Sequence, residues 1–355
     1  MQLDRRQRLR VAVMRPLSRR MLASPRLRKY FLARAQASLD EGLDPDLAIL
    51  AGLDARTGDS EVAKRTPAQV RRHMRTSVAI VDDPGTAHAV TTRELTVAGA
   101  VGPRPARAYV PDGLAAPSAA IVFFHGGGWV TGDLDTHDGL CRKLAALGRV
   151  RVIAVDYRLA PEHAYPAAAD DAIAAFRDVI ARADELGVRR DRVGVAGDSA
   201  GGNLSAVVAL ATRRDAHPPA LQALLYPAVD LTCAYPSHQR RADAFILNAR
   251  AIAWYRAHYL GPSPSAERLR EPLLSPLRAA DLAGVAPAYV LTAAFDPLHD
   301  EGVAYAERLR AAGVAVTARD EAALVHGFLV LTRVSPACAH ATDAICTEVG
   351  ALLAR

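Results

Sequence analysis

The feature that most restricts the fold is an alternation of short apolar runs with longer helical stretches, which begins near residue 91. The apolar runs have the length of buried strands, and the stretches between them have helical character. This alternation predicts a protein of the α/β class, with a mostly parallel sheet covered by helices on both faces. The expected strands lie at 119–124, 151–155, 193–196, 221–225, 289–292 and 314–317, and the expected helices at 134–147, 167–186, 200–213 and 301–312.

Two segments depart from this alternation. Residues 1–90 are helical and irregular in pattern, with a short apolar stripe at Met14, Leu17 and Met21, and we expect Pro16 and Pro25 to divide them. Residues 231–286 have the pattern of helices with Pro-rich joints and resemble an insertion between two core strands.

The net charge of +6 is concentrated in the N-terminal arm, defined as residues 1–34. The arm holds eleven Arg or Lys and one acid, a net charge of +10, so the rest of the chain is net −4. Such an arm favours weak contact with an anionic membrane surface, or is simply a solvated helix face. Without zinc-finger spacing or interleaved aromatic residues, we expect no nucleic-acid partner.

The apolar stretches of the arm are too short for a secretory signal, so we expect a cytoplasmic protein, with membrane association left open. The four cysteines are scattered, without CxxC spacing or the density of a disulfide scaffold, and this pattern is typical of reduced thiols. No cofactor and no metal are expected. A homodimer is one assembly that the sequence leaves open.

Residues 197–201 read Gly-Asp-Ser-Ala-Gly, between an expected strand and an expected helix. This is the G-x-S-x-G pattern in the strand–turn–helix context of a nucleophile elbow. Gly197 and Gly201 leave room for a sharp turn that exposes the Ser199 hydroxyl, and Asp198 and Ala200 complete the motif. We therefore predict Ser199 as a nucleophile, whereas a tight turn without chemistry is the plainer alternative.

Residues 125–128 read His-Gly-Gly-Gly and follow the expected strand at 119–124. Consecutive glycines are entropically costly, and they allow backbone N–H groups to approach a developing oxyanion without obstruction by side chains. We predict Gly127 and Gly128 as oxyanion donors together with the N–H of Ala200, and His125 and Gly126 as supporting residues of the motif.

A general base and an orienting acid are expected after the nucleophile, in that order along the chain. Asp296 and His326 both follow expected strands, at the sheet edge where open α/β sheets bind ligands. His326 would accept the Ser199 proton, and Asp296 would orient the imidazole. His299 and Asp300 are the competing candidates nearby.

Six motifs in order resemble the bacterial branch of the hormone-sensitive lipase family, the GDSAG-type esterases, over roughly residues 80–355. The resemblance implies an α/β-hydrolase fold with eight strands and a helical cap. It also implies carboxylesterase activity on short to medium acyl esters, with a small lipophilic ester as substrate. The matching motifs are His125-Gly126-Gly127-Gly128-Trp129, Asp156-Tyr157-Arg158-Leu159-Ala160-Pro161-Glu162, Gly197-Asp198-Ser199-Ala200-Gly201-Gly202-Asn203, Leu225-Tyr226-Pro227, Asp296-Pro297-Leu298 and His326-Gly327-Phe328.

On this resemblance, residues 1–90 form the basic arm and part of the cap, and residues 91–355 form the catalytic domain with a cap insertion at about 231–275. His299 replaces the arginine that the family usually has after Asp-Pro-Leu, which weakens an expected salt bridge near Asp296. Hydrolysis of amides or formamides on the same scaffold is an alternative. A non-catalytic binding protein is a further one, against which His326 argues. The natural substrate, acyl-chain preference, enantioselectivity, oligomeric state and role of the arm do not follow from the sequence.

Overall fold

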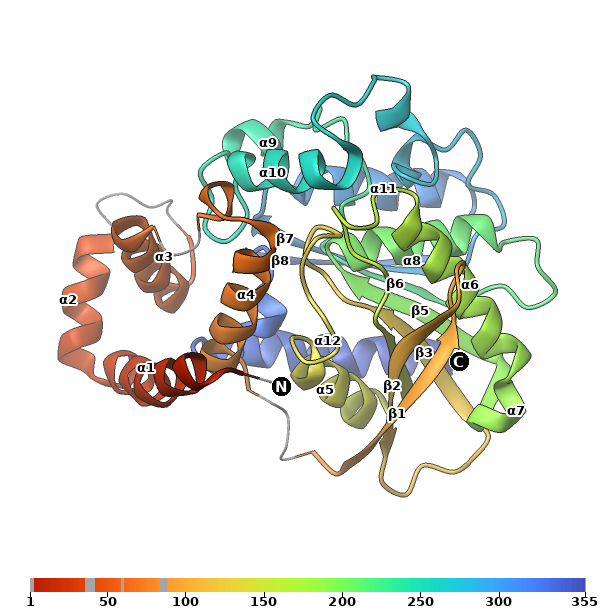
Figure 1. The fold of residues 1–355 in the computed structure, drawn as a ribbon, viewed down its shortest axis with the longest axis horizontal. Helices are drawn as coiled ribbons and strands as arrows, with labels where there is room; N and C mark the ends of the chain where they lie inside the picture. Colours follow the sequence, from red (N-terminus) through yellow and green to blue (C-terminus); the bar gives the residue numbers. More distant parts are fainter. Residues whose placement is uncertain (1–2, 36–41, 59–60, 84–87, 355) are drawn as a thin grey trace.

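A computed structural model describes residues 3–35, 42–58, 61–83 and 88–354 (Figure 1). Its centre is one eight-stranded sheet in the order β1-β2-β4-β3-β5-β6-β7-β8. The strands are β1 (Val90–Ala98), β2 (Pro103–Pro111), β3 (Ser118–Phe124), β4 (Arg151–Val155), β5 (Val188–Asp198), β6 (Gln222–Leu225), β7 (Ala288–Phe295) and β8 (Val316–Val325).

The sheet is mostly parallel, as the alternation predicted. Strands β3 to β8 pair in parallel, whereas β2 pairs antiparallel with both β1 and β4. No strand was expected at 103–111, because three prolines and two arginines interrupt the apolar residues of β2.

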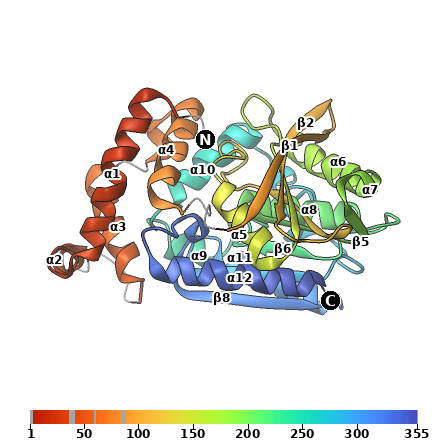
Figure 2. The ribbon, with the colours of Figure 1, turned by 90° about the horizontal axis from the view of Figure 1, so that it is seen from below.

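Side chains of β3 alternate between two cores, one on each face of the sheet. Ile121 and Phe123 belong to the core under α5 (Asp138–Gly148) and α12 (Pro336–Ala354), whereas Val122 and Phe124 belong to the core under α6 (Ala167–Ala181) and α8 (Ala200–Ala211). Two further helices, α7 (Ala183–Leu186) and α11 (His299–Ala311), belong to the same layered part of the chain. Figure 2 shows the sheet and its covering helices from below. The double covering explains why parallel strands such as β3 and β7 are continuous apolar runs.

The N-terminal region is helical, as expected, and lies to one side of the sheet (Figure 1). It contains α1 (Arg5–Ala23), α2 (Pro25–Ala35), α3 (Pro45–Thr57), a short 3-10 helix, η2 (Val62–Lys64), and α4 (Pro67–Val81). Gln7 ties α1 to α4, because its side-chain amide donates to the Thr76 hydroxyl over 2.8 Å.

The expectation that Pro16 divides the N-terminal region is wrong, because α1 runs through Pro16. A proline costs a helix one N–H donor, and a helix that is held by contacts on either side can continue past it. Pro25 does act as a boundary and begins α2. Of the apolar stripe, Met14 and Leu17 are exposed to solvent, while the side chain of Met21 lies outside the described part of the chain.

Between β6 and β7 the chain leaves the sheet and forms α9 (Pro236–Arg240), α10 (Ala249–Leu260) and two 3-10 helices, η3 (Arg268–Arg270) and η4 (Pro276–Arg278). Tyr259 of α10 stacks on Trp129, with ring centroids 4.5 Å apart, so this inserted segment packs against the loop after β3. Within the described ranges, no helix combines the length and the apolar character needed to cross a membrane.

Candidate active site

Ser199 occupies the turn between β5 and α8, with φ 54° and ψ −116°. This backbone conformation is unfavourable for a residue with a side chain and persists only where the surroundings enforce it. Gly197 and Gly201 make the turn sterically feasible, because a Cβ at either position would collide with backbone atoms, including the carbonyl of Phe124. The two glycines predicted from the motif are therefore required by packing.

His326 and Asp296 form a hydrogen-bonded row with Ser199. The Nε2 atom of His326 lies 2.9 Å from Ser199 Oγ, and Nδ1 lies 2.6 Å from Asp296 Oδ2. Asp296 is fully buried and His326 nearly so, which shields both hydrogen bonds from water. Because a carboxylate only accepts, the Nδ1–H donates to Asp296, which leaves Nε2 as the acceptor for the serine hydroxyl.

The loop that carries Asp296 is held from two sides. Its other carboxylate oxygen accepts the N–H of Leu298 over 2.8 Å, and the Ser237 hydroxyl of α9 donates to the carbonyl of Pro297 over 2.6 Å. Asp300, the competing acid, instead accepts the Ser237 N–H and pairs with Arg240 and His299. The geometry therefore brings Asp296 to His326 and directs Asp300 away from it.

His299, where the family usually has arginine, retains two charged partners. Its ring nitrogens lie 2.8 Å from Asp300 and 3.3 Å from Asp320. The Asp320 carboxylate is the largest influence and raises the pKa of His299, against the effect of burial. His299 thus takes the place of the family's arginine near Asp296 and keeps contact with these two carboxylates.

The glycine loop after β3 lies beside Ser199. Gly127 and Gly128 have φ of 119° and 59°, and a Cβ would collide with the backbone of Thr131 at the first and with Tyr255 at the second. Within the described part of the chain, no hydrogen bond uses the N–H groups of Gly127, Gly128 or Ala200. Ala200 is the first residue of α8, where helix N–H groups remain free for an anion.

Asp198 joins the elbow to the glycine loop, because its Oδ1 accepts the N–H of Gly126 over 2.8 Å. His137, which the sequence analysis passed over, pairs with the same carboxylate, with Nε2 3.2 Å from Oδ1. Burial lowers the pKa of His137, but the Asp198 carboxylate outweighs burial and raises it. Only the fold brings these residues together, and no motif around His137 indicates the pairing.

His125 supports the same loop by packing. Its ring stacks on Tyr157 at 4.4 Å between centroids, and its Nδ1 lies 2.8 Å from the carbonyl oxygen of Gly126. Burial lowers the pKa of His125 to about 4, so the ring is neutral at physiological pH. The Tyr157 hydroxyl donates to the His125 carbonyl over 2.7 Å and fixes the start of the loop.

Replacing His137 by Leu is expected to lower the free energy of unfolding by about 3–5 kcal/mol, because the buried Asp198 carboxylate loses the imidazole that it faces. His217 is exposed, and His217→Leu is the matched control, expected to change stability by less than about 0.5 kcal/mol. Urea unfolding followed by circular dichroism measures both values. Equal stabilities of the two variants would contradict the role assigned to the His137–Asp198 pair.

A cavity of about 850 Å³ opens over Ser199 and His326. Most of its wall is apolar, with contributions from α1, α3, α4, α10 and the glycine loop. A concave and mainly apolar site with a few converging polar groups is the usual form of a small-molecule site. The apolar wall includes Met14, Leu17, Leu50, Leu53, Val70, Met74, Val78, Ile246, Leu247, Ile252 and Val330.

Comparison with known proteins gives consistent matches. A sequence model of the family described as "alpha/beta hydrolase fold" matches residues 121–330, more than half of the chain. The chain belongs to the α/β-hydrolase family. "Carboxylic ester hydrolase LipN" of Mycobacterium tuberculosis is 41% identical over 341 residues, which cover 92% of this hydrolase and 88% of the relative.

Two further matches agree with this assignment. "Ethyl acetate hydrolase" of Pseudomonas putida is 42% identical over 63% of this hydrolase and 71% of the relative. Among solved structures, an α/β-hydrolase enzyme from the metagenome of Lake Arreo superposes with a TM-score of 0.83 at 35% identity, over 89% of this hydrolase and 100% of that chain. The resemblance to the hormone-sensitive lipase branch, the fold class and the assignment as a serine ester hydrolase are therefore confirmed.

Proposed function

We propose that this hydrolase cleaves carboxylic esters of short to medium acyl chains through a covalent acyl-Ser199 intermediate. The observation that carries the proposal is the row Ser199–His326–Asp296, with hydrogen bonds of 2.9 and 2.6 Å, at the floor of an apolar cavity. A hydroxyl hydrogen-bonded to an imidazole, which is in turn oriented by a buried carboxylate, is the arrangement that activates serine for attack on a carbonyl carbon.

In the first half-reaction, Ser199 Oγ bonds to the carbonyl carbon while His326 takes the hydroxyl proton. The carbonyl oxygen becomes an oxyanion, which the N–H groups of Gly127, Gly128 and Ala200 stabilise. The C–O bond to the alcohol then breaks, and the alkoxide leaves with the proton from His326. In the second half-reaction, water repeats the sequence on the acyl-enzyme, which releases the acid and restores Ser199.

The proposed acyl-chain range is tested with p-nitrophenyl esters from acetate to palmitate. We expect the highest kcat/KM between two and about eight acyl carbons, because a cavity of about 850 Å³ must hold the acyl and alcohol parts together. A maximum at the palmitate ester would contradict the proposed range. The matching p-nitroanilides test the amide alternative, which no observation favours.

We propose that α1 to α4 and the segment near 231–275 act as a cap that selects substrates. Side chains from both segments line the cavity together with Ser199: Met14 and Met74 belong to the N-terminal part, and Leu247 and Tyr255 to the inserted part. The position of α9 and α10 over the edge of the sheet agrees with this role (Figure 1). A ligand that reaches Ser199 would contact both segments.

We also propose that the N-terminal arm contacts anionic membranes, which would bring the cavity near lipid-dissolved esters. On α1, the side chains of Leu9 and Val13 are exposed by 67% and 55%, and their spacing of four residues places them on one helix face. Exposed cationic side chains flank this stripe, which is typical of helices that lie on lipid surfaces. They include Arg5, Arg6, Arg8, Arg10 and Arg20.

Arg5→Gln, Arg6→Gln and Arg8→Gln combined are expected to weaken binding to vesicles of phosphatidylglycerol and phosphatidylcholine by roughly 100-fold, at about 1 kcal/mol per cation. Sedimentation with vesicles measures the loss, and pure phosphatidylcholine vesicles are the control. The same changes at Arg189, Arg190 and Arg192, on the partly exposed first half of β5, are the matched variant. Equal binding by the two triple variants would refute the membrane proposal.

A further inference from the structure

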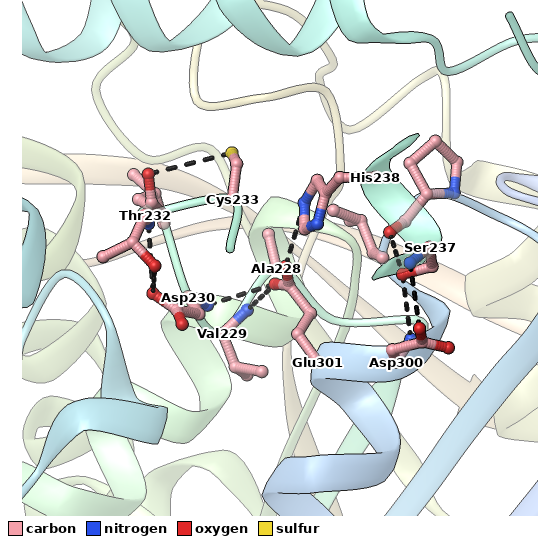
Figure 3. Close-up of polar contacts among 12 residues, drawn as sticks. Ala228, Val229, Asp230, Thr232, Cys233, Ser237, His238, Asp300 and Glu301 are labelled. Carbon is pink, nitrogen blue, oxygen red and sulfur yellow. Dashed lines mark hydrogen bonds and ion pairs between the residues drawn. The ribbon is translucent and has the colours of Figure 1, made fainter. Parts of the chain in front are cut away.

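One part of the cavity lining, here called the polar end, carries several ionisable side chains close together. It is formed by the segment that follows β6, which begins beside the nucleophile because the Ala228 N–H donates to the Ser199 carbonyl over 3.2 Å. Figure 3 shows the side chains of this segment gathered around Glu301 of α11. The ionisable or thiol-bearing side chains that line this end are Asp230, Cys233, His238, Arg256 and Glu301.

Asp230 does not contribute a free negative charge to this end. Its carboxylate lies 2.6 Å from the guanidinium of Arg278, and its other oxygen accepts the N–H and hydroxyl of Thr232 over 3.0 and 2.8 Å. The side chain is fully buried. The Asp230–Arg278 pair is therefore electrically balanced and occupied by its own partners.

Glu301 and His238 form a second balanced pair, with one nitrogen to spare. One Glu301 oxygen accepts the N–H groups of Val229 and Asp230 over 2.7 and 3.1 Å, and the other lies 3.2 Å from His238 Nε2 (Figure 3). The His238 side chain is only 9% exposed, and its Nδ1 has no hydrogen-bond partner among the residues that the structure describes. A buried donor without an acceptor is costly unless a ligand completes it.

The charge state of His238 makes this spare nitrogen a donor. Burial lowers the pKa of its imidazole, but the neighbouring Cys233 and Glu301 outweigh burial and raise it to about 10. Burial also raises the pKa of Glu301, while the nearby His238 opposes this shift. His238 is consequently an imidazolium at neutral pH, with both ring nitrogens protonated.

Arg256 adds a cation that no carboxylate balances. Its Nη1 reaches the Leu231 carbonyl at 3.3 Å and the Cys233 sulfur at 3.8 Å, both of which are uncharged or weak acceptors. Within the described ranges, no Asp or Glu oxygen lies within 4 Å of this guanidinium. The polar end of the cavity thus carries a net positive charge and two donor groups.

We propose that Arg256 and His238 form a subsite for a carboxylate of the substrate, so that this hydrolase prefers esters that carry an acidic group. The inference rests on the proposed function, because it places the ester bond at Ser199 and the acidic group at the polar end. A guanidinium and an imidazolium together offer the charge-assisted donors that a carboxylate requires. The apolar wall would hold the chain between the two groups.

Two pairs of esters test the subsite on either side of the ester bond. Monoethyl adipate is compared with ethyl hexanoate, and 6-acetoxyhexanoate with hexyl acetate, at about pH 8 in a pH-stat. Each pair differs only in a terminal carboxylate. We expect a higher kcat/KM for the acidic ester in at least one pair, with the advantage expressed mainly in KM, because the subsite binds a group remote from the reacting bond.

Arg256→Met removes the cation with little loss of apolar contact, and Arg250→Met, at an exposed position on the same helix, is the matched control. We expect Arg256→Met to reduce the acidic-to-neutral ratio of kcat/KM by about tenfold or more, and Arg256→Lys to restore part of it. His238→Gln should reduce the ratio as well, whereas Arg250→Met should leave it unchanged.

Binding is measured apart from catalysis by titrating monoethyl adipate into the Ser199→Ala variant in a calorimeter, with and without Arg256→Met. Binding that weakens about tenfold on loss of Arg256 would support the subsite even if the nucleophile assignment failed. A preference for the neutral ester in both pairs would overturn the subsite. The subsite would also be overturned if Arg256→Met left unchanged both the acidic-to-neutral ratio of kcat/KM and the affinity for monoethyl adipate. If the wild-type protein hydrolysed none of the four esters, the result would count against the proposed function and not against the subsite.

Discussion

Ser199→Ala is expected to lower kcat for p-nitrophenyl butyrate by on the order of 10⁶-fold, because the covalent route is lost completely. In the proposed mechanism this hydroxyl forms the bond to the carbonyl carbon, and it lies 2.9 Å from the Nε2 atom of His326 that activates it. A residual rate above that in water would come from the glycine loop, which can still polarise a bound carbonyl. Steady-state release of p-nitrophenol measures the effect.

Ser205→Ala is the matched control for this prediction. Ser205 lies on the same helix, and its hydroxyl donates only to the carbonyl of Gly201 over 2.9 Å. Its loss should leave kcat nearly unchanged, and circular dichroism should show that both variants are folded. A Ser199→Ala variant that retained more than about 1% of the wild-type rate would remove Ser199 from the mechanism.

The second large effect is expected for Asp296→Asn, which should lower kcat on the order of 10⁴-fold. An amide at this position can donate to His326, which favours the ring tautomer whose Nε2 carries the proton and cannot accept one from Ser199. Asp300→Asn is the matched control, because Asp300 interacts with Ser237, Arg240 and His299 rather than with His326. Its loss should weaken the support of the loop and cost far less in kcat.

The comparison of these two variants decides which acid orients the imidazole. If Asp300→Asn costs more in kcat than Asp296→Asn, the assignment of Asp296 is wrong. A parallel measurement of thermal stability separates catalysis from folding, since the Asp300 contacts between α9 and α11 are structural.

The fold class followed from the sequence because the strands of a parallel sheet are buried on both faces and appear as uniform apolar runs. The apolar runs located β3 and β4 to within one residue of their ends. They gave no prediction where a strand lacks a continuous apolar sequence. Prolines and arginines interrupt the apolar residues of β2, and α1 continues through Pro16 although a proline usually interrupts a helix.

The residues of the candidate site were accessible from sequence to the extent that they lie in local motifs. Gly197 and Gly127 are required by their own backbone turns, so their positions can be inferred from a few neighbouring residues. His137 and Arg256 were missed, because their significance depends on partners 61 and 23 residues away. Long-range pairing leaves no local pattern, and only the three-dimensional arrangement reveals it.

The central claim, a covalent route through Ser199, is tested most directly by trapping. Diethyl p-nitrophenyl phosphate phosphorylates an activated serine and stops at that stage, so the modified residue can be identified by mass spectrometry of peptides. We expect one diethylphosphoryl group per chain, located on Ser199, with loss of esterase activity in proportion to labelling and no labelling of Ser199→Ala. Complete inactivation with Ser199 unmodified, or with the label on another residue such as Cys233, would contradict the mechanism.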